Sequence, residues 1–202
     1  MANLDFIFSL FGVVLALCLA EVLTGVARVA RQKRDAALAG RDDVRIGFLT
    51  PLLAAFLLFD ITSFWAVAWA LRDAVSANYQ VLIFGLFATS LYYVAASWVF
   101  PASADGSVDL DVYYLKHKSV VFTLVFTANV VSYLGRGWVL GSIGMPGARS
   151  YDYALLAIYY LLQLAGIFVR GKRANLVILL GLILGYVEAT FGVGIRLMQA
   201  IF

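Results

Sequence analysis

The sequence predicts an all-α integral membrane protein with six transmembrane helices. Of its 202 residues, 63% are apolar and 13% are charged, whereas soluble domains are roughly half apolar and about a quarter charged. Apolar stretches of roughly 18 residues or more are typical of membrane-spanning helices, and the chain holds six of them. Its Lys and Arg residues also gather in alternate connections, as they do in polytopic proteins.

The predicted helices leave no room for a soluble domain. The first, at 6–28, is too long for a signal-peptide core, and it lacks both a basic flank before it and a cleavage site of small residues. We therefore expect it to be a permanent helix. We predict a single transmembrane domain over residues 1–202, with helices at about 6–28, 48–71, 79–100, 118–138, 151–170 and 174–198.

The basic residues predict the orientation of the chain. Six lie between the first two helices, two (Lys116 and Lys118) between the third and fourth, and three between the last two (Arg170, Lys172 and Arg173). These connections, which fall on one side of a six-helix chain, hold 11 of the 15 Lys and Arg residues. The positive-inside rule makes that side cytoplasmic. We expect a multi-pass protein of the bacterial inner membrane with both termini outside.

The sequence leaves open a 3+3 inverted repeat, the plan of many transporters. The segment YVAAS (93–97) resembles YVEAT (186–190), and FSLF (8–11) resembles FTLV (122–125). Apolar matches as short as these arise readily by chance, so they do not establish the repeat.

The last helix carries polar and small residues along one stripe. At helical spacing Glu188 shares a face with Gly181, Gly185, Gly192 and Arg196. Gly181 and Gly185 form a GxxxG pair, which lets a neighbouring backbone approach closely. We therefore expect Glu188 to point into a helix contact and away from lipid, and the glycine face to serve helix packing or an oligomer contact.

Each of the other helices also has a polar stripe. Asp60 lies near the middle of the helix at 48–71, and Glu21 lies in the inner half of the helix at 6–28, two turns before Arg28. The remaining stripes comprise Ser90, Tyr93 and Ser97; Asn129, Ser132, Tyr133 and Arg136; and Tyr159, Gln163 and Gly166. The interior of the bundle should therefore be polar.

Three carboxylates at membrane depth need an explanation, because an acidic residue at a helix centre costs about 2.5–3.5 kcal/mol on insertion scales. In one interpretation Asp60 and Glu188 pair with Arg136, Arg196 or Asn129 and lock the bundle. In the other they line an ion or proton path, or one of them stays protonated. For Asp60 and Glu188 the sequence favours neither interpretation. Glu21, near the inner face, fits the structural one better.

Several other residue types are expected to be structural. The tyrosine pairs at 92–93, 113–114 and 159–160 are typical of packing and interfaces. Cys18 is the sole cysteine, so no internal disulfide forms, and His117 is expected in an interfacial segment before the helix at 118–138. No Cys/His cluster, phosphate-binding loop or Ser–His pairing is evident, so we expect no metal, no cofactor and no enzyme activity. Basic residues confined to helix ends do not indicate nucleic acid.

Three features resemble a group of uncharacterised six-helix membrane proteins of proteobacteria. The first helix runs into a basic loop, the sequence RD ends the second helix, and a DLDVYYLKHK segment precedes the fourth. The resemblance spans most of the chain and implies six helices, but it implies no activity and no site residue.

Two functions fit these observations. The first is a small channel or transporter for an ion, a proton or a small solute, with Asp60 and Glu188 as midplane sites and Asn129, Tyr133 and Arg136 on the facing helix. The second is an accessory or scaffolding subunit of a larger membrane complex, in which the polar stripes serve only assembly. Both imply lipid as the surroundings, with a homo-oligomer or a membrane-complex partner.

Overall fold

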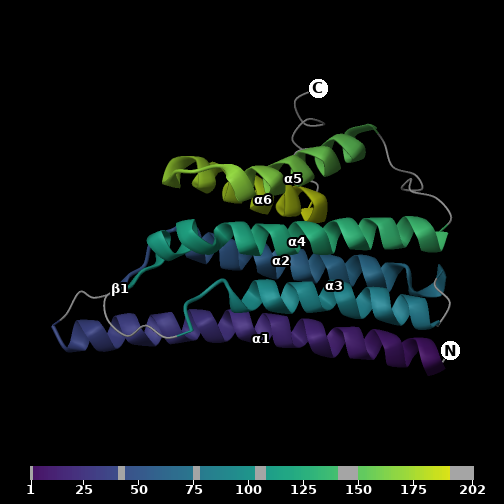
Figure 1. Ribbon diagram of the computed structural model, residues 1–202, viewed down its shortest axis with the longest axis horizontal. Helices are drawn as coiled ribbons and strands as arrows, with labels where there is room; N and C mark the ends of the chain where they lie inside the picture. Colours follow the sequence, from purple (N-terminus) through teal and green to yellow (C-terminus); the bar gives the residue numbers. More distant parts are fainter. Residues whose placement is uncertain (1, 41–43, 75–77, 103–107, 141–149, 192–202) are drawn as a thin grey trace.

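The computed structural model describes residues 2–40, 44–74, 78–102, 108–140 and 150–191 (Figure 1). Within these residues the chain is almost entirely helical. The helices are α1 (Ala2–Leu38), α2 (Leu49–Ala70), α3 (Tyr79–Ser97), α4 (Leu110–Leu140), α5 (Ser150–Phe168) and α6 (Lys172–Phe191), with a short 3-10 helix η1 (Arg72–Ala74). Two strands of two residues each, β1 (Val44–Arg45) and β2 (Val108–Asp109), pair in parallel.

Five helical segments are long and apolar enough to cross a membrane: Phe6–Leu38, Leu49–Ala70, Tyr79–Ser97, Leu110–Trp138 and Ser150–Phe168. The chain is therefore an all-α, multi-pass membrane protein, as its composition predicts. The described part of α6 is not among the five, and it includes Lys172, Arg173 and Glu188. The predicted sixth span is thus not confirmed.

The helices form three layers of two (Figure 1). Helices α5 and α6 cover one side of a central pair, α2 and α4, and α1 and α3 cover the other side. Following the contacts, α1 packs on α3, α3 on α4, α4 on α5, α5 on α6, α6 on α2 and α2 on α1, while α2 and α4 also touch across the middle. The 3+3 repeat is not confirmed: α1 packs along α3, but the corresponding α4 and α6 make no comparable contact among the described residues.

The first helix is longer than the sequence predicts. The stretch after Arg28, expected to be a basic loop, continues as helix to Leu38. Its residues are mainly Ala, Arg, Lys and Gln, which have high helix propensity, and nothing in them breaks a helix. The helix ends where Gly40 adopts a φ of 68°, in the left-handed region that glycine enters without steric cost.

The fourth helix begins at Leu110, eight residues before the predicted start at 118. The side chain of Asp109 accepts hydrogen bonds from the backbone N–H groups of Asp111 (2.9 Å) and Val112 (3.1 Å), and so caps the helix. The predicted interfacial segment is therefore, from residue 108 on, a strand pairing followed by the first turns of α4. His117 lies inside that helix, with its ring 4.2 Å from the ring of Tyr113 and 5.6 Å from that of Trp98.

The side chain of Asp111, in the first turn of α4, forms hydrogen bonds with the starts of α2 and α6. Its Oδ1 accepts the backbone N–H of Leu49 (3.1 Å) at the start of α2, and its Oδ2 accepts from Nζ of Lys172 (3.2 Å) at the start of α6. A Cβ on Gly47 would lie 2.0 Å from Oδ1 of Asp111, so only glycine fits beside this carboxylate.

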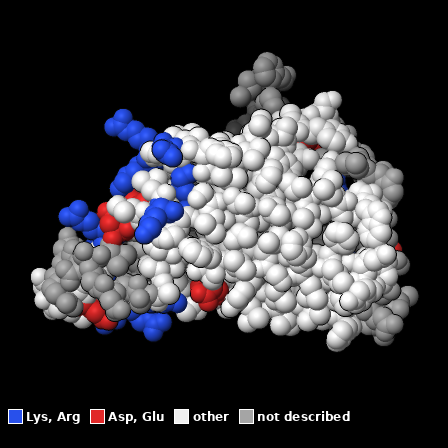
Figure 2. Space-filling view, in the orientation of Figure 1, with Lys and Arg blue, Asp and Glu red and all other residues white. Residues whose placement is uncertain are grey.

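The Lys and Arg residues gather at the end of the bundle that holds β1, and the rest of the visible surface is nearly uncharged (Figure 2). We call this end the basic end. Its basic residues in the described part of the chain are Arg28, Arg31, Lys33, Arg34, Arg45, Lys116, Lys118, Arg170, Lys172 and Arg173. The three basic connections of the sequence therefore meet at one end of the molecule.

Candidate functional site

Asp60 lies at the middle of α2, and its side chain is almost completely buried, at 1% exposure. It accepts hydrogen bonds from the hydroxyl groups of Tyr159 on α5 and Tyr186 on α6. Nδ2 of Asn129 on α4 lies 3.1 Å from Oδ2 and 3.4 Å from Oδ1 of the carboxylate. One carboxylate thus joins four helices.

A second set of hydrogen bonds holds these donors in place. The hydroxyls of Tyr159 and Tyr186 lie 2.7 Å apart, and the hydroxyl of Tyr92 on α3 is 3.4 Å from Oδ1 of Asn129. We call Asp60, Tyr92, Asn129, Tyr159 and Tyr186 the Asp60 cluster. Its members come from five helices, so the cluster both fixes the carboxylate and connects the layers of the bundle.

Asp60 is held by neutral donors. The ion pairs between described residues are Arg72–Asp73 and Lys172–Asp111, both away from the cluster. A buried charge that lacks an opposite charge depends on its hydrogen bonds for stability. Phenol and amide donors satisfy the ionised carboxylate, and the same hydroxyls can turn to accept a bond when the carboxyl is protonated. The arrangement can therefore accommodate both protonation states.

The cluster borders a partly open cavity of about 660 Å³. Its walls come from the second halves of α2, α4 and α6 and from the first half of α5, so it lies in the half of the bundle away from the basic end. The polar and charged residues that line it are Asp60, Ser63, Asn129, Ser132, Tyr133, Arg136, Asp152, Tyr159, Tyr160, Tyr186 and Glu188. Leu155, Leu156, Ile158 and Leu162 of α5 give it an apolar wall.

Toward the basic end the cavity meets a packed core. The rings of Phe56 and Phe122 stack with centroids 5.9 Å apart, and Phe56 also lies 6.3 Å from the ring of Tyr186. Leu57 and Leu179 nearby are fully buried. Asp60 therefore lies between the cavity on one side and the packed core on the other.

Gln163 on α5 lies one turn beyond Tyr159 in the direction of the basic end. Its side chain is fully buried, and neither Oε1 nor Nε2 has a hydrogen-bond partner among the described residues. A buried amide without partners is costly, and native proteins have few of them. Gln163 is thus a polar group without a structural hydrogen bond inside the core that closes the cavity.

Arg136 on α4 lines the cavity two turns beyond Asn129, in the direction away from the basic end. Its Nη2 atom is buried and has no hydrogen-bond partner among the described residues. The guanidinium carbon lies 5.1 Å from the ring centroid of Tyr133, close enough for a cation–π contact. An arginine so placed has donor capacity left for a further group.

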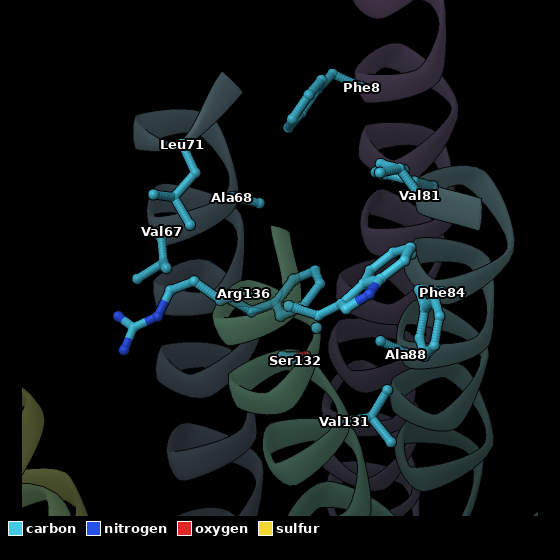
Figure 3. Close-up of a pocket in the computed structure, with 15 residues that line it drawn as sticks. Phe8, Val67, Ala68, Leu71, Val81, Phe84, Ala88, Val131, Ser132 and Arg136 are labelled. Carbon is cyan, nitrogen blue, oxygen red and sulfur yellow. The ribbon is translucent and has the colours of Figure 1, made fainter. Parts of the chain in front are cut away.

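A second, smaller pocket of about 150 Å³ lies on the other side of the α2–α4 pair. Its lining is nearly all apolar, with Phe8 of α1, Val81, Phe84 and Ala88 of α3 and Val67 of α2 among its residues (Figure 3). Arg136 lines both pockets. Figure 3 shows its guanidinium group pointing away from Phe84 and Ala88, toward α2.

The structure brings most of the predicted site residues together. Asp60, Asn129, Ser132, Tyr133, Arg136, Gly181, Gly185 and Glu188 all line the larger cavity. Asn129 contacts Asp60, which is one of the pairings predicted from the sequence. Glu188 is half-buried, and the hydroxyl of Tyr151 donates to its Oε1 at 3.4 Å. Gly192 and Arg196 lie outside the described residues.

Of the two described glycines on the predicted packing face, one packs as expected and the other does not. A Cβ on Gly181 would lie 3.1 Å from Leu162 of α5, so this glycine does permit a close helix contact. A Cβ on Gly185 would meet nothing within 4 Å, because Gly185 faces the cavity. This glycine keeps the cavity wide and does not bring two backbones together.

Glu21 stands apart from the site. It is half-buried on α1, which contributes no residue to the larger cavity. Its expected neighbour Arg28 instead donates to the backbone carbonyls of Pro101 (2.8 Å) and Ala102 (3.0 Å) just after α3. Arg28 thus holds the segment that follows α3 against α1.

The sequence does not predict the tyrosine hydrogen bonds of the Asp60 cluster. The sequence predicts packing for Tyr92, and for Tyr159 both a packing pair and a polar stripe; both tyrosines belong to the hydrogen-bonded cluster. The stripe of Tyr159, Gln163 and Gly166 was a usable signal, since a buried polar stripe needs partners. Nothing in the spacing of α6 distinguished Tyr186 from its neighbours.

No group of three or more His, Cys, Asp or Glu side chains suited to a metal ion occurs in the described parts of the chain. The chain matches no family model, no curated protein and no solved structure.

Proposed function

We propose that this protein is a small membrane transporter or channel that moves a proton, alone or with a small solute, and that Asp60 is its proton-binding group. The observation that carries the proposal is a carboxylate at the middle of a membrane helix, held by neutral donors at the floor of an open cavity. Ionisable residues at such depth are costly and mark ion or proton pathways by default.

Neutral donors support proton binding in preference to a purely structural ion pair. A carboxylate paired with Arg or Lys is locked in its charged form, whereas phenols and an amide can serve either form. Tyr159, Tyr186 and Asn129 would keep the carboxyl in place while its charge changes. Gln163, the unpartnered amide in the core beyond, would offer the next polar group toward the basic end.

The distribution of Lys and Arg supports one orientation of the protein in the membrane. The basic end would face the cytoplasm by the positive-inside rule, with α6 as the sixth span. The cavity would then open to the outside, and both termini would lie there. Because a packed core separates Asp60 from the cytoplasmic end, release on that side would require the α5–α6 layer to move against α2 and α4, as in alternating access.

Proton flux in liposomes tests the proposal. Purified protein is reconstituted, a pH gradient is imposed, and internal pH is followed for the wild type, for Asp60→Asn and for Glu21→Gln. Glu21 is the matched control, because it is also a carboxylate within a helix span but lies outside the cavity. We expect Asp60→Asn to abolish proton flux and Glu21→Gln to retain it. Thermal unfolding in detergent should show that both variants are folded.

Two results would contradict the proposal. In the first, the wild type carries no proton flux over a range of pH, voltage and added solutes. In the second, Asp60→Asn lowers the unfolding temperature but leaves flux intact, which would make the cluster a structural joint. That second result would favour an accessory or scaffolding role.

A further inference from the structure

The cavity is lined by an arginine with an unpartnered donor atom. Nη2 of Arg136 is buried and finds no hydrogen-bond partner among the described residues. The guanidinium group is always charged, and it carries five N–H donors and no acceptor. Arg136 as a whole is half-buried, but a buried N–H donor without an acceptor is costly. The group that completes the site should therefore be an acceptor, and a negative charge satisfies it best.

Asp60 differs from Arg136 in this respect. Its carboxylate accepts from Tyr159 and Tyr186 at Oδ1 and from Asn129 at Oδ2, so each oxygen has a donor within the protein. Arg136 follows Asn129 by seven residues on α4, which corresponds to about 10 Å of helix rise. A small molecule can therefore contact the unpartnered Nη2 atom without displacing the donors of the Asp60 carboxylate.

The walls around Arg136 indicate what kind of molecule fits. Leu155, Leu156, Ile158 and Leu162 face the cavity from α5, and Tyr133 lies beside the guanidinium group. The volume of about 660 Å³ is in the range of small-molecule sites, which are mainly apolar with a few polar groups that fix orientation. The lining suits a compact apolar body attached to one charged group.

The acidic residues of the cavity narrow the choice of anion. Asp60, Asp152 and Glu188 line it from α2, α5 and α6, and Arg136 from α4. Carboxylates repel a second negative charge on the same ligand. The site therefore suits a monoanion better than a dianion.

We propose that this cavity binds a small amphipathic organic monoanion, with its oxyanion group on Arg136 and its apolar body against the leucine wall of α5. This inference rests on the proposed function and names its solute class. A proton on Asp60 and an organic anion on Arg136 would move together as an electrically neutral pair. The oxyanion could belong to a soluble carboxylate or to the phosphodiester of an anionic lipid, and the test separates these sources.

Binding is measured by titration calorimetry on protein in phosphatidylcholine nanodiscs, with three probes of similar shape: benzoate, benzylammonium and benzyl alcohol. We expect benzoate to bind most tightly. Arg136→Gln should lower the affinity for benzoate by at least about tenfold. Arg136→Lys should retain part of the affinity, because lysine keeps the positive charge but lacks the planar guanidinium group that can donate two parallel hydrogen bonds. Arg72→Gln is the control, since Arg72 also lies at the end away from the basic residues but outside the cavity.

Repeating the titration in nanodiscs that contain phosphatidylglycerol identifies the source of the anion. The site would be assigned to a lipid phosphate if the wild type binds benzoate more weakly in these nanodiscs than in phosphatidylcholine alone, and if Arg136→Gln shows no such difference between the two lipids. Unchanged binding would assign it to a soluble carboxylate. Both results support an oxyanion site at Arg136.

Three results would overturn the inference: tighter binding of benzylammonium than benzoate, no loss in Arg136→Gln, or no binding of any probe. Proton flux that depends on Asp60, together with any of these, would leave the proposed function standing without this solute class. Benzoate binding that depends on Arg136, in a protein without proton flux, would instead retain the site and reject proton transport.

Discussion

At the scale of residues, the molecule is organised around a carboxylate that has hydrogen bonds but no ion pair with any described residue. Asp60 accepts from three side chains on three other helices. Interhelical hydrogen bonds in membranes contribute about 0.5–2 kcal/mol each, because the unfolded state in lipid also finds partners. The cluster is therefore a moderate source of stability and a defined chemical site.

Removing one hydrogen-bond donor from the Asp60 cluster should lower the stability of the fold by about the contribution of one hydrogen bond. We expect Tyr186→Phe to lower the free energy of unfolding by about 0.5–2 kcal/mol, because the carboxylate loses a donor while the ring stays in place. Tyr93→Phe is the control, since Tyr93 is exposed and should change by less than about 0.5 kcal/mol. Unfolding in mixed micelles with increasing denaturing detergent gives both values. Equal effects of the two variants would show that the Tyr186 hydroxyl is not bonded to Asp60.

Gln163 makes a contrasting prediction. Because neither polar atom of its side chain is bonded among the described residues, Gln163→Met should raise the free energy of unfolding by about 1 kcal/mol, through loss of an unsatisfied buried amide at nearly constant volume. The same unfolding titration measures it. A decrease would mean that Gln163 binds water or another group in the folded protein.

The sequence predicts Asp60 and its partner Asn129 because each is polar at the centre of an apolar helix. It does not predict which tyrosines join them. Tyr92, Tyr159 and Tyr186 lie in segments where aromatic residues are common, and their roles depend on how α3, α5 and α6 turn toward α2. Helix rotation is set by packing, which the spacing of residues in one helix does not determine.

At the scale of elements, α6 forms one wall of the cavity through its glycines. Gly185 has open space where a Cβ would lie, and so does Gly135 on α4, but Gly135 lines the smaller pocket. The two positions form a matched pair for filling one cavity or the other.

We expect Gly185→Leu to reduce flux at least about tenfold by occupying the larger cavity, and Gly135→Leu to leave flux within about twofold. Both changes add the same side chain and raise helix propensity by about 1 kcal/mol, so neither should unfold the protein. Flux in liposomes and thermal unfolding are measured on the same preparations. Loss of flux in both variants, or in neither, would contradict transport through the larger cavity.

The element boundaries show what hydropathy misses. Helix α1 continues through its basic segment to Leu38, and α4 begins at Leu110, because helix propensity and the Asp109 cap continue helices past the apolar region. The pairing of β1 with β2 joins two connections far apart in sequence, so no local pattern announces it.

At the scale of the whole molecule, the Lys and Arg residues that alternate connections carry in the sequence gather at one end of the bundle (Figure 2). Three connections that the sequence assigns to one side meet at the basic end. This part of the fold was predictable, because alternation of helices fixes which connections share a side. The position of the cavity in the opposite half was not predictable, since it depends on how the α5–α6 layer packs on α2 and α4.

Cysteine labelling tests the proposed orientation. In a Cys18→Ala background, Asp73→Cys places a thiol at the end away from the basic residues, and Ala39→Cys places one at the basic end; both positions are exposed. A membrane-impermeant maleimide added to intact cells should label Asp73→Cys and spare Ala39→Cys. Disrupted cells should label both. The reverse pattern in intact cells would invert the proposed topology.

The central claim is that Asp60 takes up and releases a proton while its neutral donors hold it in place. Infrared difference spectroscopy of the reconstituted protein after a pH change tests it most directly, because a protonated carboxyl has a carbonyl stretch distinct from that of a carboxylate. We predict a pH-dependent carboxyl band in the wild type that persists in Glu21→Gln and disappears in Asp60→Asn. A band unaffected by Asp60→Asn, or no band across the pH range in which the protein stays folded, would contradict the claim.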